Sequence, residues 1–569
     1  MKDAISSLVS SALQQAIAAG ELPLGVAPDP ALERPRDASH GDWATSVALR
    51  CAKEAGMNPR QVAQIVSARM ADLPDVDAVE IAGPGFINIR LSAAALQRVL
   101  REARVQGCDF GRGDAGAGRR VQVEFVSANP VGPMHVGHGR WAALGDSMAR
   151  VLAHSGWNVE REFYVNDAGV QMDIFAKSVA ARYLEFCGRT DVTFEDNWYQ
   201  GAYIAEIARE LFESEGTCWL EVDAAERESH FKQTAYEQVL VHLEQVLSGM
   251  GVDFDVWFSE LTLHEKGADG LTAIERGIAA LRDAGYIYEL DGATWFRSTD
   301  FADDKDRVLI KADGEYTYFA ADIAYHKNKF DRGFDRVINI WGADHHGYVA
   351  RMKAACSALG HDGQLDVVIG QLVNLFRNGE AVRMSKRTGE MVTFEELLDE
   401  VGADAARYWF LRRSTDQPVD FDIELARQQS ADNPVFYVQY AHARICSIIR
   451  KATGANTAEN PAAAALLAAE FLPGDADLSP LTDPAELALM RKLSEFPEVV
   501  EAAARELSPH KLTRFAEDLA TTFHQFYTQC RVMTDDPALT TARLYAVDAT
   551  RSALEAVLGL LGVGAPERM

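Results

Sequence analysis

The sequence predicts an α/β protein in which a doubly wound parallel sheet stands between an N-terminal α+β domain and a C-terminal all-α domain. Three observations support this fold class. A strand–loop–helix–strand pattern covers residues 121–165, a second one covers residues 336–370, and from about residue 394 onward the pattern is almost entirely helical. Two such βαβ units are the halves of a doubly wound sheet, whereas the long helical stretch forms a domain of its own.

The N-terminal domain opens with helical periodicity and then shows two alternating strands, DAVEIA and FINIRLS. A Gly-Pro-Gly turn at 83–85 joins these strands, which indicates a hairpin. A glycine-rich linker follows. We therefore expect domains at 1–106, 107–430 and 431–569, with an insertion at about 170–300 between the two halves of the sheet.

The sheet itself is predicted from four short apolar runs. They are VQVEFV (121–126), VEREFYV (159–165), RVINIW (336–341) and LDVVIG (365–370). The helix between the first two runs carries apolar residues at i, i+4, i+7 and i+8, which places them on one stripe facing the core. These residues are Leu144, Met148, Val151 and Leu152.

Size and composition exclude several classes of protein. The chain has 569 residues, and no apolar run is long enough to span a bilayer. The N-terminal stretch carries Asp3, Gln14 and Gln15 and lacks a clear cleavage site, so we interpret it as an amphipathic helix rather than a signal peptide. We therefore expect a cytoplasmic protein with no membrane association.

The seven cysteines are too scattered to form a CxxC zinc signature. They predict neither a structural zinc site nor a disulfide framework, but small, buried and reduced side chains. The formal net charge of −28 disfavours non-specific binding of nucleic acid. A nucleic-acid partner would therefore have to meet a locally basic face.

The strongest chemical signal is PMHVGH at residues 133–138, where a strand gives way to a helix. Gly137 lets a nucleotide approach the backbone closely, and the helix N-terminus favours phosphates. His135 and His138 are one helical turn apart, so both imidazoles can face the same oxygen atoms. Hydrogen bonding to charge that develops on an α-phosphate suits them. Two incidental histidines at a helix start are the alternative for this motif alone.

A second motif, RMSKR at residues 383–387, follows a predicted type I′ turn at Asn378-Gly379. Lys386 on such a loop can close over ATP and neutralise the leaving pyrophosphate, although a solvated basic turn is the usual fate of a run like this. Together, HxGH and MSK resemble the HIGH and KMSKS motifs of class I aminoacyl-tRNA synthetases, whose sheet is Rossmann-type. Arg383 and Arg387 depart from KMSKS, but both keep or add positive charge. The resemblance implies that His135, His138 and Lys386 are catalytic.

Longer strings resemble one family within this class, the bacterial arginyl-tRNA synthetases. They are VEFVSANPVGPMHVGHGR (123–140), FYVNDAGVQ (163–171), YFAADIAYH (318–326), GADHHGYVARM (342–352) and YVQYAHAR (437–444). The resemblance extends from HGDWAT (40–45) to the last residue. It implies ATP-dependent ligation of L-arginine to tRNA(Arg) through an arginyl-adenylate, which releases AMP and diphosphate, with Mg²⁺ accompanying ATP.

The chemistry of a guanidinium fits residues in these strings. The guanidinium group is planar, always charged and offers five donors, so its pocket needs a carboxylate and further acceptors in fixed geometry. Tyr318 and Asp322, spaced i, i+4 at a helix start, can reach one ligand. The resemblance implies that they hold the guanidinium and that Ser127 and Asn129 hold the α-amino and carboxylate end. The remaining candidates are an acidic residue and a histidine, namely Glu124 and His346, with His345 as the alternative to His346.

The ATP site is implied by the same resemblance. Gly342 and Asp344 follow the C-terminal end of a strand, where such sheets bind their ligands, and would approach the ribose. Val382 and Met384 would offer backbone groups to the adenine. The other ATP-binding residues in this interpretation are Pro133, Gly137 and Ser385.

The helical segment 431–569 resembles the anticodon-binding domain of the family. Residues that match anticodon-loop contacts are Tyr437, Tyr440, Tyr527 and Met569, and stacking on aromatic faces is how unpaired bases are usually held. Tyr437 and Tyr440 are one turn apart and fit a helix core equally well. In the N-terminal domain, Phe86 and Asn88 match positions that read a D-loop base, with a plain β-strand as the alternative.

The resemblance further implies a monomer that needs bound tRNA before it activates arginine. Three other functions remain open at this point. A class I synthetase for a different amino acid is the main one, although a cysteinyl enzyme would need metal-spaced cysteines. A small nucleotidyltransferase would lack the long helical domain, and a catalytically dead tRNA-binding protein would be expected to lose His135, His138 or Lys386.

Overall fold

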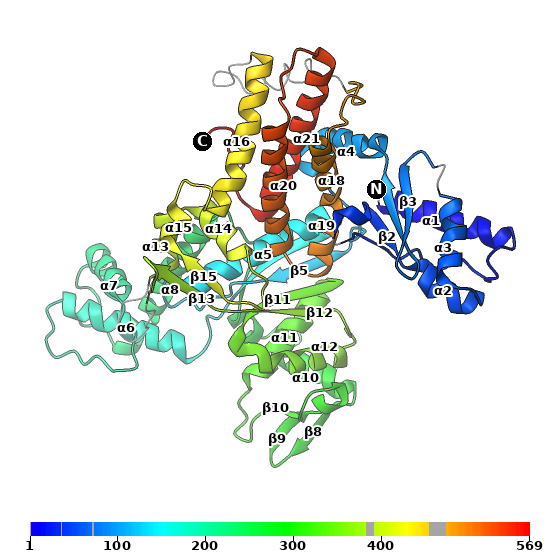
Figure 1. The fold of residues 1–569 in the computed structure, drawn as a ribbon. Helices are drawn as coiled ribbons and strands as arrows, with labels where there is room; N and C mark the ends of the chain where they lie inside the picture. Colours follow the sequence, from blue (N-terminus) through cyan, green and yellow to red (C-terminus); the bar gives the residue numbers. More distant parts are fainter. Residues whose placement is uncertain (1, 36, 71–72, 383–391, 455–473) are drawn as a thin grey trace.

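The computed structural model of the chain describes residues 2–35, 37–70, 73–382, 392–454 and 474–569. Figure 1 shows a central α/β body, an N-terminal domain to one side, a helical bundle above the body and two excursions of the chain away from it. The predicted fold class is confirmed. Within the described residues, no helix is both long and apolar enough to cross a membrane.

The N-terminal domain contains a four-stranded antiparallel sheet with strand order β1-β2-β4-β3. The predicted hairpin is confirmed, because Ala82 of β3 lies opposite Phe86 of β4. Its elements are α1 (Lys2–Ala18), β1 (Leu32–Glu33), η1 (Ala38–His40), β2 (Trp43–Thr45), α2 (Val47–Ala55), α3 (Pro59–Ala68), β3 (Val76–Ala82), β4 (Phe86–Leu91), α4 (Ala93–Gln106) and η2 (Gly107–Asp109).

The central sheet has five parallel strands in the order β12-β11-β5-β6-β7. The strands are β5 (Arg120–Glu124), β6 (Asn158–Val165), β7 (Val256–Ser259), β11 (Arg336–Gly342) and β12 (Leu365–Gly370). The chain runs outward from β5 to β7 on one side and returns to β11 on the other side of β5. The order of strands therefore reverses between β5 and β11, and the carboxyl ends of these two strands form the expected ligand crevice.

Several strands were not expected from the sequence, and two of them extend sheets of the central body. β7 lies inside the segment predicted as an insertion and extends the central sheet. It was not predicted because VWFS at 256–259 is only four residues long. β15 (Val419–Asp422) lies in the region predicted to be helical and pairs in parallel with β13 (Val373–Arg377). Other elements around it are β14 (Glu380–Ala381), α13 (Phe394–Val401), α14 (Ala403–Leu411) and α15 (Ile423–Arg427).

The chain between β6 and β11 leaves the sheet twice. The first excursion is helical, with α6 (Val170–Phe186), α7 (Ala202–Glu215) and α8 (Ala224–Gly249). The second contains α9 (Leu261–His264), α10 (Ala273–Asp283), β8 (Ile287–Leu290), β9 (Ala293–Phe296), η3 (Ser298–Phe301), β10 (Arg307–Ile310) and α11 (Tyr318–Asp331). After β11 follow η4 (Ala343–Tyr348) and α12 (Val349–Ala358). In Figure 1, α11 and α12 lie on one side of the sheet and α5 on the other.

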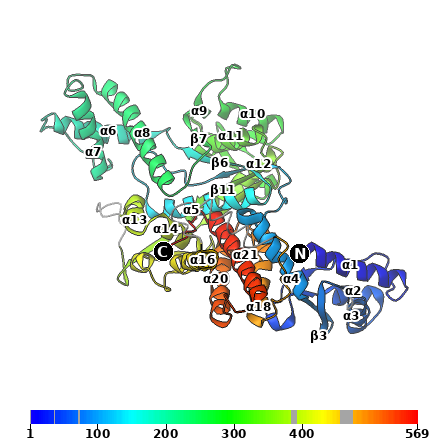
Figure 2. The same ribbon diagram turned by 90° about the horizontal axis from the view of Figure 1, so that it is seen from above.

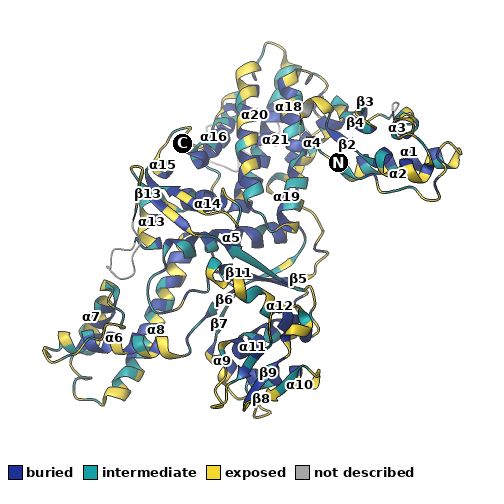
Figure 3. Ribbon diagram, turned by 60° about the horizontal axis from the view of Figure 1, so that its bottom comes forward, coloured by how far each residue is buried: buried dark blue, intermediate teal, exposed yellow. Residues whose placement is uncertain are grey.

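Helix α5 (Val136–His154) is buried between the sheet and the helical bundle, as Figure 3 shows. The predicted core stripe is confirmed, because Leu144, Met148, Val151 and Leu152 are each at most 2% exposed. Gly145 lets β5 approach closely, since a Cβ there would lie 2.0 Å from the ring of Phe125. The helix that begins with HVGH is therefore fixed on all sides along its length.

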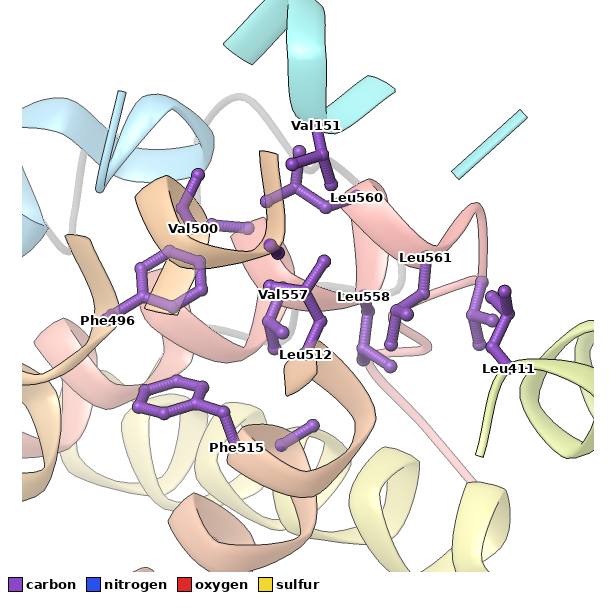
Figure 4. Packing of buried hydrophobic residues seen from close by; sticks show 14 of the residues in the cluster. Val151, Leu411, Phe496, Val500, Leu512, Phe515, Val557, Leu558, Leu560 and Leu561 are labelled. Carbon is purple, nitrogen blue, oxygen red and sulfur yellow. The ribbon is translucent and has the colours of Figure 1, made fainter. Parts of the chain in front are cut away.

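The C-terminal domain consists of helices packed around one apolar core. They are α16 (Pro434–Thr453), α18 (Pro484–Ser494), α19 (Phe496–Arg505), α20 (His510–Gln529) and α21 (Pro537–Leu561). Figure 4 shows that Val151 of α5 and Leu411 of α14 belong to the same cluster as Phe496, Leu512 and Leu561. The core of the bundle is thus continuous with the core above the sheet.

Polar contacts reinforce this junction. The Ser147 hydroxyl of α5 donates to the main-chain oxygen of Leu560 at 2.9 Å. Arg407 of α14 is fully buried, pairs with the Asp146 carboxylate of α5, and donates to the main-chain oxygen of Leu561 at 3.0 Å. The last turn of α21 is therefore hydrogen-bonded to the middle of the HVGH helix.

The N-terminal domain is joined to the helical bundle through arginine–carboxylate pairs, in the region where Figure 2 shows α4 beside α18 and α21. The pairs are Arg34 with Glu498, Arg104 with Asp548, and Arg491 with Asp42, at 2.7, 2.9 and 2.8 Å. All seven cysteines are free thiols, as predicted. The prediction that they are buried is wrong for Cys108 in η2 and for Cys218, which are exposed, and Cys187 is only half-buried.

Candidate active site

The two histidines of HVGH lie against each other at the start of α5. His135 is the N-cap residue, and its ring stacks on that of His138 with centroids 3.7 Å and planes 18° apart. The main-chain nitrogen of His135 donates to Nδ1 of His138 at 3.3 Å. Because Nδ1 accepts this bond, Nε2 carries the proton of the neutral His138 ring. The structure therefore brings together the two imidazoles that the sequence predicts to act on one phosphate.

The chain on either side of the RMSKR motif is held by described elements. Asn378 and Gly379 have φ angles of 54° and 80°, which agrees with the predicted type I′ turn between β13 and β14. Beyond the motif, the main-chain nitrogen of Phe394 donates to the main-chain oxygen of Met134 at 2.9 Å, so the chain re-enters beside HVGH. The predicted residues of the motif lie outside the described residues, namely Arg383, Met384, Ser385, Lys386 and Arg387.

Two glycines in the first turn of α5 have close neighbours. A Cβ on Gly139 would lie 2.2 Å from Cε2 of Phe394, so α5 and α13 approach too closely for a side chain there. A Cβ on Gly137 would lie 2.9 Å from Cε1 of His135. The absence of a side chain at Gly137 thus also leaves room for the His135 ring, in addition to the predicted role of Gly137 in admitting a nucleotide.

The predicted ATP crevice lies where Trp141 crosses the carboxyl ends of β11 and β12. A Cβ on Gly342 would lie 3.3 Å from the Trp141 ring, and one on Gly370 would lie 2.4 Å from its Nε1. Gly342 ends β11, and the Asp344 side chain that follows is 82% exposed and lies 3.5 Å from Nε2 of His345. The structure therefore places Gly342 and Asp344 at the switch point of the sheet.

The other described ATP candidates lie at the edge of this region. Pro133 lines a cavity of about 190 Å³ beneath α7 and α8. The Tyr203 hydroxyl of α7 donates to the main-chain oxygen of Val131 at 2.9 Å and so holds that loop. The main-chain nitrogen of Val382 donates to the main-chain oxygen of Leu375 at 2.9 Å. This nitrogen is therefore occupied in the present conformation, which leaves the Val382 carbonyl as the group that could meet adenine.

Three neighbouring carboxyl groups, which we call the acidic pocket, lie at the carboxyl ends of β5 and β7. Glu124 ends β5, Glu260 follows β7, and Asp322 projects from α11; the two glutamates are 6% and 7% exposed. Burial raises the pKa of Asp322 to about 6. The hydrogen bond from the Tyr348 hydroxyl opposes this rise, whereas the carboxylates of Glu124 and Glu260 add to it. Burial also raises the pKa of Glu260, which is hydrogen-bonded to Tyr164. Neighbouring carboxyl groups with raised pKa values favour binding of a cation between them.

Glu260 was missed by the sequence analysis, since β7 itself was not expected. An acidic residue directly after the apolar run VWFS was the signal that could have identified it. The neighbouring Asp167 accepts from the Ser259 hydroxyl at 2.5 Å and from the main-chain nitrogen of Leu261 at 3.1 Å. Asp167 thus fixes the turn that positions Glu260.

Ser127 and Glu124 are joined at the end of β5. The Ser127 hydroxyl donates to Oε1 of Glu124 at 3.1 Å and accepts from the main-chain nitrogen of Tyr164 at 3.2 Å. Val126 and Ser127 have φ angles of 68° and 42°, an unusual conformation for a β-branched residue and its neighbour. A strained backbone conformation of this kind persists where contacts with the surrounding structure hold it in place. Here it directs the Ser127 side chain toward Glu124.

Three predicted arginine ligands are not gathered in the pocket. Tyr318 is 80% exposed at the first position of α11. Asn129 is exposed and donates to the side-chain oxygen of Gln171 at 2.9 Å. His346 is exposed, whereas His345 lies close enough to Asp322 to lower the pKa of its carboxyl. Of the two histidines left open by the sequence, the structure thus places His345 by the acidic pocket.

The predicted anticodon surface forms a cluster of rings around Arg444. Its guanidinium lies 4.9 Å from the ring centroid of Tyr440 and 5.1 Å from that of Tyr527, and both tyrosines are more than a third exposed. The Tyr437 ring is 5.1 Å from His524. Met569 is 55% exposed and lines a cavity of about 660 Å³ between α14 and α16.

The predicted D-loop contacts are on β4. Phe86 is partly buried next to the hairpin turn, where a Cβ on Gly85 would lie 3.0 Å from Pro59. Asn88 is only 7% exposed, so little of its side chain is open to a tRNA in this conformation. Among the residues that the structure describes, no group of three or more histidines, cysteines, aspartates or glutamates is arranged to hold a metal ion.

Three family models match successive parts of the chain. Residues 3–91 match the arginyl tRNA synthetase N terminal domain, residues 101–445 match the catalytic domain of tRNA synthetases class I (R), and residues 438–569 match the DALR anticodon binding domain.

Curated proteins match over the whole length. The arginine–tRNA ligase of Heliobacterium modesticaldum is 50% identical over 566 residues, with 99% of this chain and 98% of the relative covered. That of Moorella thermoacetica is 49% identical, with 100% and 99% covered. The structure of Thermus thermophilus arginyl-tRNA synthetase shares the fold, with a TM-score of 0.73 and 23% identity over 100% of both chains. The chain therefore belongs to the arginyl-tRNA synthetase family.

Proposed function

We propose that this protein ligates L-arginine to tRNA(Arg) in two steps. The arginine carboxylate attacks the α-phosphate of ATP and forms arginyl-adenylate and diphosphate; the 3′-terminal ribose hydroxyl of the tRNA then takes the arginyl group and releases AMP. Class I synthetases use ATP in this reaction, generally with Mg²⁺. The observation that carries the assignment of arginine is the acidic pocket of Glu124, Glu260 and Asp322, beside HVGH.

The pocket suits a guanidinium in both charge and position. Asp322 and Glu260 are carboxylates whose pKa values are raised in the absence of a cation, and a bound guanidinium would offer five donors to them. We assign the guanidinium end to Asp322 and Glu260, and the amino-acid end to Ser127. Tyr318 and Asn129, which lie outside the pocket in this conformation, would join these two ends by turning toward bound arginine. A class I synthetase for a different amino acid is not favoured, because the full-length relatives are arginine–tRNA ligases.

His135 and His138 act on the α-phosphate and Lys386 on the leaving diphosphate in this proposal. The stacked pair at the N-terminus of α5 is placed to donate hydrogen bonds where negative charge increases in the transition state. The ATP ribose lies at Gly342 and Asp344, and the adenine at Val382. Because no step forms a bond between enzyme and substrate, these residues work by charge stabilisation and positioning.

The tRNA is held at both ends of the chain in the proposal. The anticodon loop meets Tyr437, Tyr440, Tyr527 and Met569, and the D-loop meets Phe86 and Asn88. We further propose a cytoplasmic monomer with domains at 1–106, 107–430 and 431–569.

The test is ATP–pyrophosphate exchange with each of the twenty amino acids, with and without tRNA(Arg). Exchange with arginine alone among the amino acids, together with arginylation of tRNA, is the expected result. Exchange with another amino acid, or none at all in the presence of tRNA, would exclude the proposed activity.

A further inference from the structure

Lys329 of α11 is a charged side chain with no exposed surface beneath the acidic pocket. Its Nζ lies 2.5 Å from Oε2 of Glu124 and 3.0 Å from Oδ1 of Asn339, and 4.3 Å from the ring centroid of Tyr325. An ammonium has three donors and no acceptor, and here its neighbours are two oxygens and a π face. Lys329 therefore donates to buried partners and does not face the substrate itself.

The first chain of hydrogen bonds leads from Lys329 to the amino-acid end of the pocket. The Glu124 carboxylate accepts from Lys329 through Oε2 and from Ser127 through Oε1, so the Ser127 hydroxyl donates its single hydrogen to Glu124. The same hydroxyl already accepts from the main-chain nitrogen of Tyr164. One lone pair of Ser127 is left, and toward a ligand this oxygen can act only as an acceptor.

The second chain leads to the guanidinium end. Because Lys329 only donates, the oxygen of the Asn339 amide turns to it, and Nδ2 donates to Nε2 of His326 at 2.7 Å. His326 then carries its proton on Nδ1 and donates to the main-chain oxygen of Asp322 at 2.8 Å. Burial, together with the charge of Lys329, lowers the pKa of His326 to about 3, which agrees with a neutral ring. Lys329 thus determines donor and acceptor directions at both ends.

We propose that Lys329 is a positioning residue which, through Glu124, makes Ser127 an obligatory acceptor and so lets the pocket select a substrate with an α-ammonium group. The proposal deepens the proposed function and rests on it. An ammonium group donates a hydrogen bond and fits this lone pair. A ligand without an α-donor leaves the half-buried acceptor without a partner, which lowers affinity.

Three ligands measure this preference by calorimetry: L-arginine, its 2-hydroxy analogue and its deamino analogue, 5-guanidinopentanoic acid. The quantity to follow is the ratio of the Kd of the deamino analogue to that of arginine. In Lys329→Met, Glu124 loses its counter-ion and becomes protonated by burial, so the direction at Ser127 is no longer fixed. The ratio should fall by about tenfold, the scale of one hydrogen bond to a charged group. Lys327→Met is the matched control, because Lys327 lies on the same helix and pairs with the exposed Asp331.

A rise of this ratio in Lys329→Met would overturn the proposal, because it would mean that the lysine acts only as a positive charge that repels the ammonium. An unchanged ratio would overturn it as well.

Glu124→Gln provides a second route should Lys329→Met fail to fold. Lys329 would then bind the amide oxygen, the amide nitrogen would donate to Ser127, and the serine hydrogen would turn to the substrate. Arginine should lose its advantage over the deamino analogue by about tenfold. The 2-hydroxy analogue should keep its advantage in affinity over the deamino analogue, because a hydroxyl can both donate and accept. Loss of both advantages would mean that Ser127 is merely displaced, and would refute the proposal.

The proposed function is judged separately, by whether the wild-type protein binds arginine and not lysine. If it binds arginine, failure of the ratio test removes only the role of Lys329.

Discussion

The main-chain nitrogen of Phe394 donates a hydrogen bond of 2.9 Å to the main-chain oxygen of Met134. A β-bridge between His135 and Thr393 continues this contact. The segment that follows RMSKR is thus attached to the HVGH motif, although the two are far apart in sequence. The position of the segment from Thr393 onward relative to HVGH is set by these backbone contacts together with the approach of Gly139 to Phe394.

Gly139→Ala should therefore lower kcat more than any substrate KM. Its Cβ would overlap the Phe394 ring at 2.2 Å, and overpacking of this kind costs about 1–3 kcal/mol in stability. Phe394→Leu should restore part of the rate in the double variant. Gly249→Ala is the control, since that helical glycine has open space around its Cβ position. Equal kinetics of the Gly139 variant and wild type would show that the spacing of α5 and α13 is not critical.

His138→Ala should reduce kcat for adenylate formation with little change in the KM for arginine. Loss of one donor to developing charge corresponds to about 2–4 kcal/mol, or on the order of 10²–10³ in rate. Single-turnover measurement of adenylate formation checks this, with thermal unfolding to confirm the fold. A change confined to the KM for arginine would contradict the assigned role.

Asp322→Asn should raise the KM for arginine far more than that for ATP. Removal of the negative charge from a partly buried pocket should weaken arginine binding by about 2–5 kcal/mol. Asp331→Asn is the control, because Asp331 lies on the same helix in an exposed pair with Lys327. Equal effects on the two substrates would indicate that Asp322 is structural.

Arginine binding should weaken as the pH falls through about 6, the pKa of Asp322 in the ligand-free protein. The affinity for arginine should fall by about tenfold per pH unit below that value, because the cation binds only the ionised carboxylate. Stability should respond in the opposite sense. A carboxyl with a raised pKa stabilises the fold at low pH, and this contribution disappears as the pH rises through 6. Asp322→Asn should thus raise the Tm of the ligand-free protein at pH 7 and leave it unchanged near pH 3.5; calorimetry across this range measures both effects.

Tyr440→Ala should raise the KM for tRNA by about one to two orders of magnitude, since stacking of one base on an aromatic ring is worth about 1–3 kcal/mol. Arginine binding measured without tRNA should not change. We also expect negligible pyrophosphate exchange without tRNA, and tRNA affinity that falls with salt because phosphate contacts release counterions. Salt-independent affinity would argue against backbone contacts, and robust exchange without tRNA would refute the coupling.

The fold could largely be predicted because its main elements have strong local signals. The stripe of Leu144 and Leu152 in α5 and the turn at Asn378-Gly379 follow from spacing and backbone preference, and both appear in the structure. β7 and β15 could not be predicted in the same way, since each has four residues and forms only because a neighbouring strand offers hydrogen-bond partners.

Parts of the candidate site could be predicted from the sequence for a different reason. HVGH is contiguous, so its geometry follows from one helix start. The Glu124–Lys329 pair and the position of Glu260 depend on contacts between strands and helices far apart in the sequence, to which no local pattern points. The exposed Tyr318 shows a further limit: a spacing of i, i+4 places two side chains on one helix face but does not decide whether the first one turns inward.

The hydrogen bond from Ser147 to Leu560 has a consequence for the order in which the newly made chain becomes structured. Its two residues are 413 positions apart, so at ribosomal rates the partner of α5 is synthesised about 20–80 s after Ser147 itself. Throughout that interval, the side of α5 that carries Ser147 lacks the end of α21 that covers it in the finished molecule. The HVGH helix therefore reaches its final environment only once synthesis of the bundle is almost complete.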